Sequence, residues 1–125
     1  MREILFRGKY IYNGEWVEGN LFIPDKENTP TQICIGTNII RITYDVIPET
    51  VGQYTGLTDK NGKKIFEGDV VKLFLVDDTE IGVIKFSDIK CRFMYYDGEG
   101  YYSFDNTCKF EVIGNIHDNP ELLNN

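Results

Sequence analysis

Short runs of β-branched and aromatic residues, separated by Gly, Asn and Asp, recur along the whole of this sequence. β-branched and aromatic side chains pack well on a sheet surface, whereas Gly, Asn and Asp favour the tight turns between strands. The apolar residues seldom recur at the spacing of three or four that an amphipathic helix requires. The pattern therefore predicts a mainly β protein.

Two β-hairpins are predicted in the N-terminal part. Their strands are expected at residues 4–12, 16–23, 33–35 and 39–42. The first hairpin turns at Asn13-Gly14, a pair that tolerates the positive φ angles of a type I′ turn. We expect residues 1–44 to form an N-terminal β-hairpin lobe. Residues 45–64, which hold three glycines and one proline, are expected to form an ordered connection.

Residues 65–125 are predicted to form a small five-stranded SH3-like barrel, because five short runs with tight turns are typical of that fold. Its strands are expected at residues 70–76, 80–86, 92–96, 101–104 and 109–114. Pro120 suits the first position of a helix, so a short C-terminal helical turn should follow the last strand. The barrel and the hairpin lobe could be separate or packed as one compact unit.

Acidic residues outnumber basic residues by 20 to 13, which gives a formal net charge of −7. The excess lies in residues 64–125, which hold 12 acidic and 6 basic residues. Nonspecific binding of nucleic acid requires a surplus of Lys and Arg facing the phosphates. The charge therefore disfavours nucleic acid as a partner, unless the few bases gather locally.

No apolar run approaches the roughly 18 residues of a membrane span, and the N-terminal residues lack the apolar stretch of a signal peptide. We expect a cytoplasmic protein with no membrane contact. The three cysteines, Cys34, Cys91 and Cys108, are too widely spaced for a zinc site or a redox pair. They are interpreted as small buried or half-buried apolar residues, and no metal or cofactor is expected.

No catalytic arrangement is evident, so the protein is not expected to be an enzyme. Its single histidine, His117, lies in the C-terminal stretch and is interpreted as a capping or surface residue. Asp77, Asp78 and Glu80 crowd a predicted turn, where acidic residues are normally solvated. A deep pocket that held His117 or two buried carboxylates would favour an enzyme instead.

Two tyrosine pairs flank one predicted turn and suggest a binding surface. Exposed tyrosines favour protein contacts, because they supply contact area at low entropic cost. Strand alternation should direct one tyrosine of each pair outward, beside the acids of the turn. The candidate interaction surface consists of Tyr95, Tyr96, Asp97, Glu99, Tyr101 and Tyr102. We therefore expect a non-catalytic protein-interaction module, which could also associate with copies of itself through open strand edges.

The alternative function is binding of single-stranded nucleic acid, which small barrels often perform. The acidic balance opposes it, so binding would need a local basic patch. The candidate patch consists of Lys85, Lys90, Arg92 and Lys109.

Three segments of the sequence resemble the YopX family of phage and prophage proteins. The longest, residues 48–71, reads PETVGQYTGLTDKNGKKIFEGDVV. The others are REILFR at residues 2–7 and VIGNIHDNPELL at residues 112–123. The resemblance implies a phage or prophage gene product that acts inside a bacterial host, with a host or phage protein as its partner. It brings no activity, cofactor or functional residue to carry over.

Overall fold

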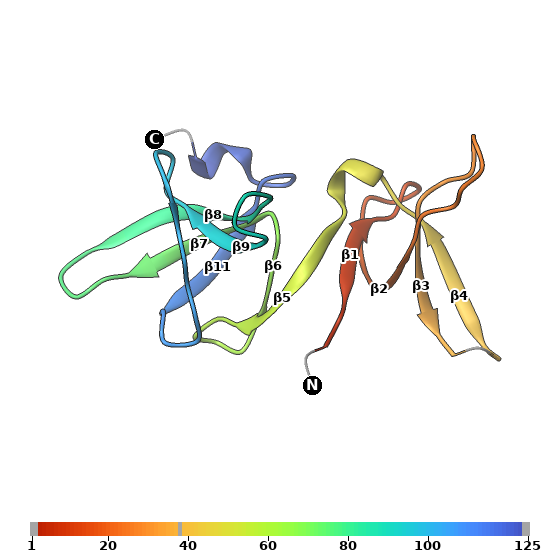
Figure 1. Ribbon diagram of the computed structural model, residues 1–125. Coiled ribbons are helices and arrows are strands. Elements are labelled where there is room, and N and C mark those ends of the chain that lie inside the picture. Colours follow the sequence, from red (N-terminus) through yellow and green to blue (C-terminus); the bar gives the residue numbers. More distant parts are fainter. Residues whose placement is uncertain (1–2, 38, 124–125) are drawn as a thin grey trace. The chain divides into compact units, whose positions relative to one another are not determined.

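The computed structural model describes residues 3–37 and 39–123, and within them it contains strands and short 3-10 helices but no α-helix (Figure 1). The strands form two antiparallel sheets, with the orders β4-β3-β2-β1-β5-β6 and β10-β9-β8-β7-β11. The predicted mainly β fold is therefore confirmed. None of the described helices has the length and apolar composition that crossing a membrane requires. Arg2, part of the first family segment, lies outside the described residues.

The chain divides into two compact units, and the boundary lies within β5, between Tyr54 and Thr55. The elements up to this boundary are β1 (Phe6–Lys9), β2 (Trp16–Phe22), β3 (Gln32–Gly36), β4 (Arg41–Asp45), the 3-10 helix η1 (Pro48–Thr50) and β5 (Gly52–Thr58). The elements of the second unit are β6 (Lys64–Phe66), β7 (Asp69–Phe74), β8 (Thr79–Ser87), β9 (Arg92–Tyr96), β10 (Tyr101–Tyr102), β11 (Phe110–Asn115) and the 3-10 helix η2 (Pro120–Leu123).

The first hairpin forms, but its predicted type I′ turn is wrong. Such a turn needs positive φ at both central residues, and only Gly14 has it, at 71°. The last strand pair is Lys9 with Trp16, so the connection spans residues 10–15. The side-chain Oδ1 of Asn13 accepts the N–H of Glu15 at 2.9 Å. This local bond holds the wider loop without a positive φ angle at Asn13.

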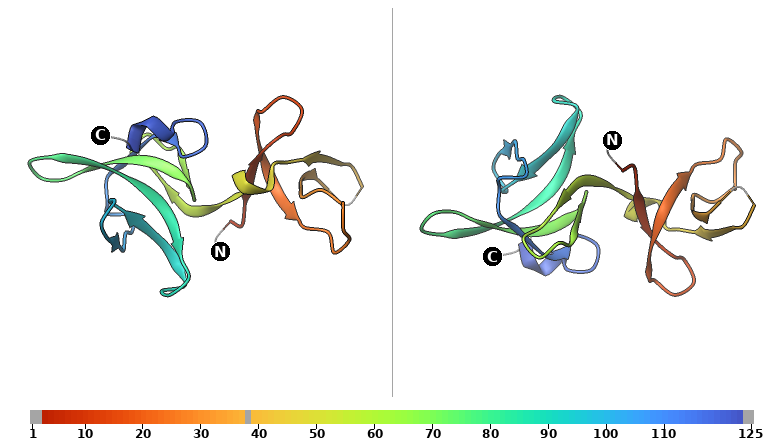
Figure 2. Two further views of the ribbon diagram at one scale, coloured as in Figure 1. Left: turned by 90° about the horizontal axis from the view of Figure 1, so that it is seen from above. Right: turned by 90° about the horizontal axis from the view of Figure 1, so that it is seen from below.

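The second unit contains a meander of neighbouring antiparallel strands from β7 to β10, with β11 beside β7. Val70 pairs with Val83, and Ile84 pairs with Tyr95. The β7–β8 hairpin extends beyond the rest of this unit (Figure 2), and Val76 near its tip is 99% exposed.

The predicted closed barrel is wrong. Among the described residues no pairing joins β10 to β11, and β6 lies beside β5 in the other sheet. The cause is local, because the strand expected at residues 101–104 ends at Tyr102. In the loop that follows, Asp105 accepts the N–H of Thr107 at 2.8 Å, which favours a turn over a strand. No ladder therefore closes the sheet.

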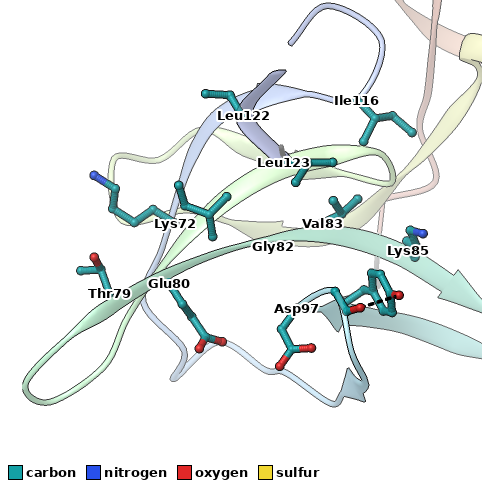
Figure 3. A pocket seen from close by; sticks show the side chains of 13 residues that line it. Lys72, Thr79, Glu80, Gly82, Val83, Lys85, Asp97, Ile116, Leu122 and Leu123 are labelled. Carbon is teal, nitrogen blue, oxygen red and sulfur yellow. Dashed lines mark hydrogen bonds between the residues drawn. The ribbon is translucent and has the colours of Figure 1, made fainter. Parts of the chain in front are cut away.

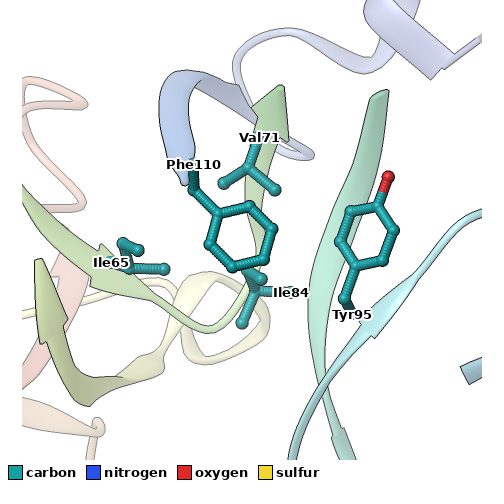
Figure 4. Close-up of a cluster of buried hydrophobic side chains, with 5 residues drawn as sticks. All are labelled: Ile65, Val71, Ile84, Tyr95 and Phe110. Atoms are coloured by element: carbon teal, nitrogen blue, oxygen red, sulfur yellow. The ribbon is translucent and has the colours of Figure 1, made fainter. Parts of the chain in front are cut away.

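The core of the second unit is a cluster of side chains from β6, β7, β8, β9 and β11 (Figure 4). Its members are Ile65, Val71, Ile84, Tyr95 and Phe110. The ring of Phe110 lies 5.7 Å from that of Tyr95 and packs edge-on against Phe104 at 5.4 Å. These aromatic contacts, together with burial of apolar area, hold the strands of the sheet together.

Two aspartates of the segment that resembles the family secure its turns. Asp59 accepts N–H bonds from Asn61, Lys63 and Val112 at 2.8–2.9 Å. Asp69, 1% exposed, accepts the N–H of Phe66 at 2.7 Å. The first set of bonds ties the turn after β5 to β11.

The predicted C-terminal helical turn is present as η2. Pro120 is its first residue, and the turn before it is capped by Asn115, whose side-chain oxygen accepts the N–H groups of His117 and Asp118 at 3.0 and 2.9 Å. His117, which was interpreted as a capping or surface residue, is half-buried in this turn, and the side chain that caps the turn is that of Asn115.

Candidate functional site

The turn between β9 and β10 is built around the side chain of Asp97. Its Oδ1 accepts the N–H of Glu99 at 2.8 Å and that of Gly100 at 2.9 Å. Gly98 supplies the positive φ angle, 102°, that the turn requires. The N–H groups of Gly100 and Glu99, with the Tyr102 side chain, hold the pKa of Asp97 below its usual range. Its carboxylate is therefore negative at neutral pH.

The four tyrosines of the candidate surface have different environments. Tyr95 is 2% exposed and belongs to the core, whereas Tyr96 is half-buried. Tyr101 and Tyr102 are 50% and 54% exposed. Alternation separates the first pair as expected. Both tyrosines of the second pair are exposed, because β10 is a two-residue edge strand whose one neighbour among the described strands is β9.

The exposed part of the hairpin is an ordered aromatic surface. The rings of Tyr96 and Tyr101 lie 4.8 Å apart, across a register pair. The hydroxyl of Tyr96 donates to the carbonyl oxygen of Gly98 at 3.0 Å. The ammonium of Lys85 lies 4.4 Å from the centre of the Tyr96 ring. These contacts hold the rings in place before any partner binds.

Two pockets of the second unit share Glu80 and Asp97. The larger one lies between β8 and the C-terminal turn, where Leu122 and Leu123 approach Val83 (Figure 3). Lys72 and Lys85 also line it, so basic groups offset the two acids there.

The second pocket, called here the Tyr95 pocket, lies on the other side of these acids. It has a volume of about 340 Å³. Its lining includes Leu73, Glu80, Tyr95, Asp97, Tyr102 and Phe104. No basic side chain occurs in this lining, all of which lies within the described part of the chain. The pocket is therefore acidic and largely aromatic.

The hydroxyl of Tyr95 lies at this pocket and is buried. The side chain of Glu80 interacts with it, although among residues 3–37 and 39–123 no group meets it in full hydrogen-bond geometry. Burial raises the pKa of Tyr95 far above its usual value, and the nearby carboxylate of Glu80 raises it further. The phenol therefore stays protonated and can donate a hydrogen bond.

The ring of Tyr95 lies directly on the backbone of Gly82. A Cβ atom at Gly82 would meet Cε1 of Tyr95 and the carbonyl oxygen of Tyr96 at 2.5 Å. The absence of a side chain at Gly82 thus allows Tyr95 to reach both the core and the pocket.

The strand register separates Lys109 from the rest of the candidate basic patch, whereas Arg92 pairs with Ser87 near Lys90. The carbonyl of Lys109 bonds to Phe74, which pairs with the first residue of β8. Lys90 lies just beyond the other end of β8 and donates its N–H to the side chain of Ser87, the last residue of that strand. A strand of nine residues is about 25 Å long. Lys109 and Lys90 therefore lie near opposite ends of β8.

The described residues do not form the other kinds of site that were considered. No group of three or more His, Cys, Asp or Glu side chains there could hold a metal ion. All three cysteines are free; Cys91 is exposed, and Cys34 and Cys108 are half-buried. Cys91 therefore departs from the buried or half-buried position expected of it.

Sequence reasoning missed the Tyr95 pocket. Glu80 was expected to begin a strand and to crowd the turn before it, but no contact with Tyr95 was predicted; it is half-buried in β8 and lines the pocket with Tyr95. The antiparallel register of β8 and β9 brings them together, and the sequence alone does not specify that register. Phe104 joins the pocket from a segment without strand structure, for which periodicity provides no signal.

The family resemblance was tested by comparison with known proteins. The model of the YopX protein family matches residues 5–124. The chain belongs to the YopX family. A solved structure, protein EF1440 from Enterococcus faecalis, is similar over 98% of this chain and 99% of that chain, at 24% sequence identity and a TM-score of 0.59. This similarity concerns the fold alone. No protein with a curated description matches the sequence.

Proposed function

We propose that this YopX protein is a non-catalytic protein-interaction module that presents the β9–β10 hairpin to a partner. The observation that carries the proposal is the ordered pair of Tyr96 and Tyr101, whose rings lie 4.8 Å apart on an edge hairpin with an acidic turn. Tyrosines that are exposed and already ordered lose little entropy on binding. Such side chains often carry much of the binding energy of an interface.

The charge of the surface favours a protein partner with basic groups. Asp97 and Glu99 lie in the turn of the hairpin, and the sequence has a net charge of −7. Complementary charge increases the rate of association and excludes partners of like charge. We infer from the family's phage and prophage association that the partner is a host or phage protein in the bacterial cytoplasm.

Replacing Tyr101 with alanine should reduce partner capture at least about tenfold, because an exposed aromatic anchor is removed from the interface. The measurement is affinity capture from bacterial lysate with nuclease added, at low and at moderate salt. Tyr12→Ala is the matched control, since Tyr12 is 74% exposed and belongs to the first unit.

Equal capture by Tyr101→Ala and wild type would refute the proposed surface. Recovery that disappears on nuclease treatment would instead favour the nucleic-acid alternative, whose binding should weaken steeply with salt.

A further inference from the structure

The lining of the Tyr95 pocket has a net negative charge, although Lys72 and Lys85 line the larger pocket that shares its two acids. Glu80 and Asp97 both line it, and no base accompanies them among its described lining residues. Figure 3 shows the two carboxylates on the same side of β8, away from Leu122 and Val83. A cation that entered the pocket would reduce the repulsion between the acids and gain two charged hydrogen-bond acceptors.

The buried hydroxyl of Tyr95 is a second indication of a ligand, because its contact with Glu80 falls short of hydrogen-bond geometry. Tyr95 is 2% exposed, and its ring packs in the core as a phenylalanine would. Phenylalanine would avoid burying a hydroxyl without a good hydrogen bond, which is unfavourable. A ligand with a polar group in the pocket would supply the missing bond.

The walls of the pocket suit the alkyl stem of a basic side chain. Tyr102 and Phe104 present aromatic rings, and Leu73 adds an aliphatic surface. Aromatic faces attract ammonium and guanidinium groups, and long basic side chains pack their methylene groups along apolar surfaces. A volume of about 340 Å³ is at the small end for ligand sites, which suits a single side chain.

We propose that the Tyr95 pocket binds a basic side chain, lysine or arginine, of the partner protein. The inference rests on the proposed function, since it specifies how the same hairpin region recognises its partner. The cationic group lies between the carboxylates of Glu80 and Asp97, and the hydroxyl of Tyr95 contributes a third polar contact. The side-chain stem then lies against Tyr102 and Phe104.

The first test is a titration of the full chain followed by NMR of its backbone amides. The probes are the N-acetyl methylamides of lysine and arginine, with the N-acetyl methylamide of norleucine as the uncharged analogue. We expect saturable shifts at the pocket residues with the cationic probes and none with norleucine. Equal shifts with norleucine, or no saturable shift with either cation, would overturn the proposal.

Three variants localise the effect. Glu80→Gln should weaken probe binding about tenfold, because it removes a charged acceptor. Tyr95→Phe should weaken probe binding several-fold. The folded state of this variant should be at least as stable as that of wild type. If the hydroxyl served only to stabilise the fold, the variant would be less stable instead. Glu99→Gln removes the same charge outside the pocket and should bind the probes as wild type does. Unchanged binding by Glu80→Gln would overturn the proposal.

The second test separates this inference from the proposed function. Capture of the partner by Glu80→Gln should fall, although this variant keeps Tyr96 and Tyr101. If Glu80→Gln captures the partner as wild type does while Tyr101→Ala does not, the pocket inference is overturned and the proposed function stands. If Tyr101→Ala captures normally, the proposed function fails, whatever the probes do.

Discussion

Replacing Asp59 with alanine should lower the free energy of unfolding by about 3 kcal/mol, since three backbone N–H groups lose a charged acceptor. Asp59 is 8% exposed, so water cannot easily replace the lost carboxylate. Asp59→Asn should cost less, because its one remaining side-chain oxygen can still accept some of these bonds. Urea unfolding of the full chain measures both changes.

The contribution of Asp59 to the free energy of unfolding should decrease at low pH. Burial works to raise the pKa of Asp59, but the N–H groups of Val112, Lys63 and Asn61 outweigh it, so the pKa lies below 3.8. The stability that the carboxylate contributes is therefore present above the ordinary pKa and is lost as pH falls through the lower pKa of the folded state. The gap between wild type and Asp59→Ala should be constant near neutral pH and should shrink below about pH 4.

Asp105→Ala is the matched control for Asp59. Asp105 accepts the backbone N–H of Thr107, two residues away, in an exposed loop. It joins no distant elements, and its loss should change stability much less. A similar loss of stability in both variants would contradict the role given to the Asp59 bonds between the turn and β11.

Local sequence patterns predicted the strands of the second unit well, because each run is bounded by residues that form real turns. Asp97-Gly98-Glu99-Gly100 is an example, since Asp97 bonds its own turn and Gly98 has a positive φ angle. The prediction of β9 is confirmed to the residue at 92–96. These features depend on neighbours in the chain, which the sequence displays directly.

The features that the sequence did not predict depend on residues that are far apart in the chain. β5 forms in a stretch that was expected to be a connection because of its glycines, and it pairs with β1 at Gly52 and Gln53. The closed barrel failed because a loop replaced the second half of one predicted strand. The pocket forms where Glu80, Tyr95 and Phe104 lie close together, and no pattern in the sequence predicts that they do. Long-range register therefore limited the prediction of both the fold and the site.

Replacing Gly82 with alanine should destabilise the protein by about 2–3 kcal/mol through overpacking. The added Cβ atom would lie 2.5 Å from the Tyr95 ring and 2.5 Å from the carbonyl oxygen of Tyr96. The ring could move only by leaving the core cluster around Ile84 and Phe110, and the carbonyl belongs to the paired strand β9. Thermal or urea unfolding would measure the loss.

The control for Gly82 is the same substitution at Gly100, in the neighbouring hairpin. Neither glycine has a positive φ angle, and a Cβ atom at Gly100 would meet Tyr102 only at ordinary contact distances of 3.6–3.8 Å. Gly100→Ala should therefore change stability little. Because displacement of Tyr95 would also remove its hydroxyl from the pocket, Gly82→Ala should lose probe binding even where it remains folded. A folded Gly82→Ala variant that binds the lysine probe normally would show that the position of the Tyr95 ring does not control the pocket.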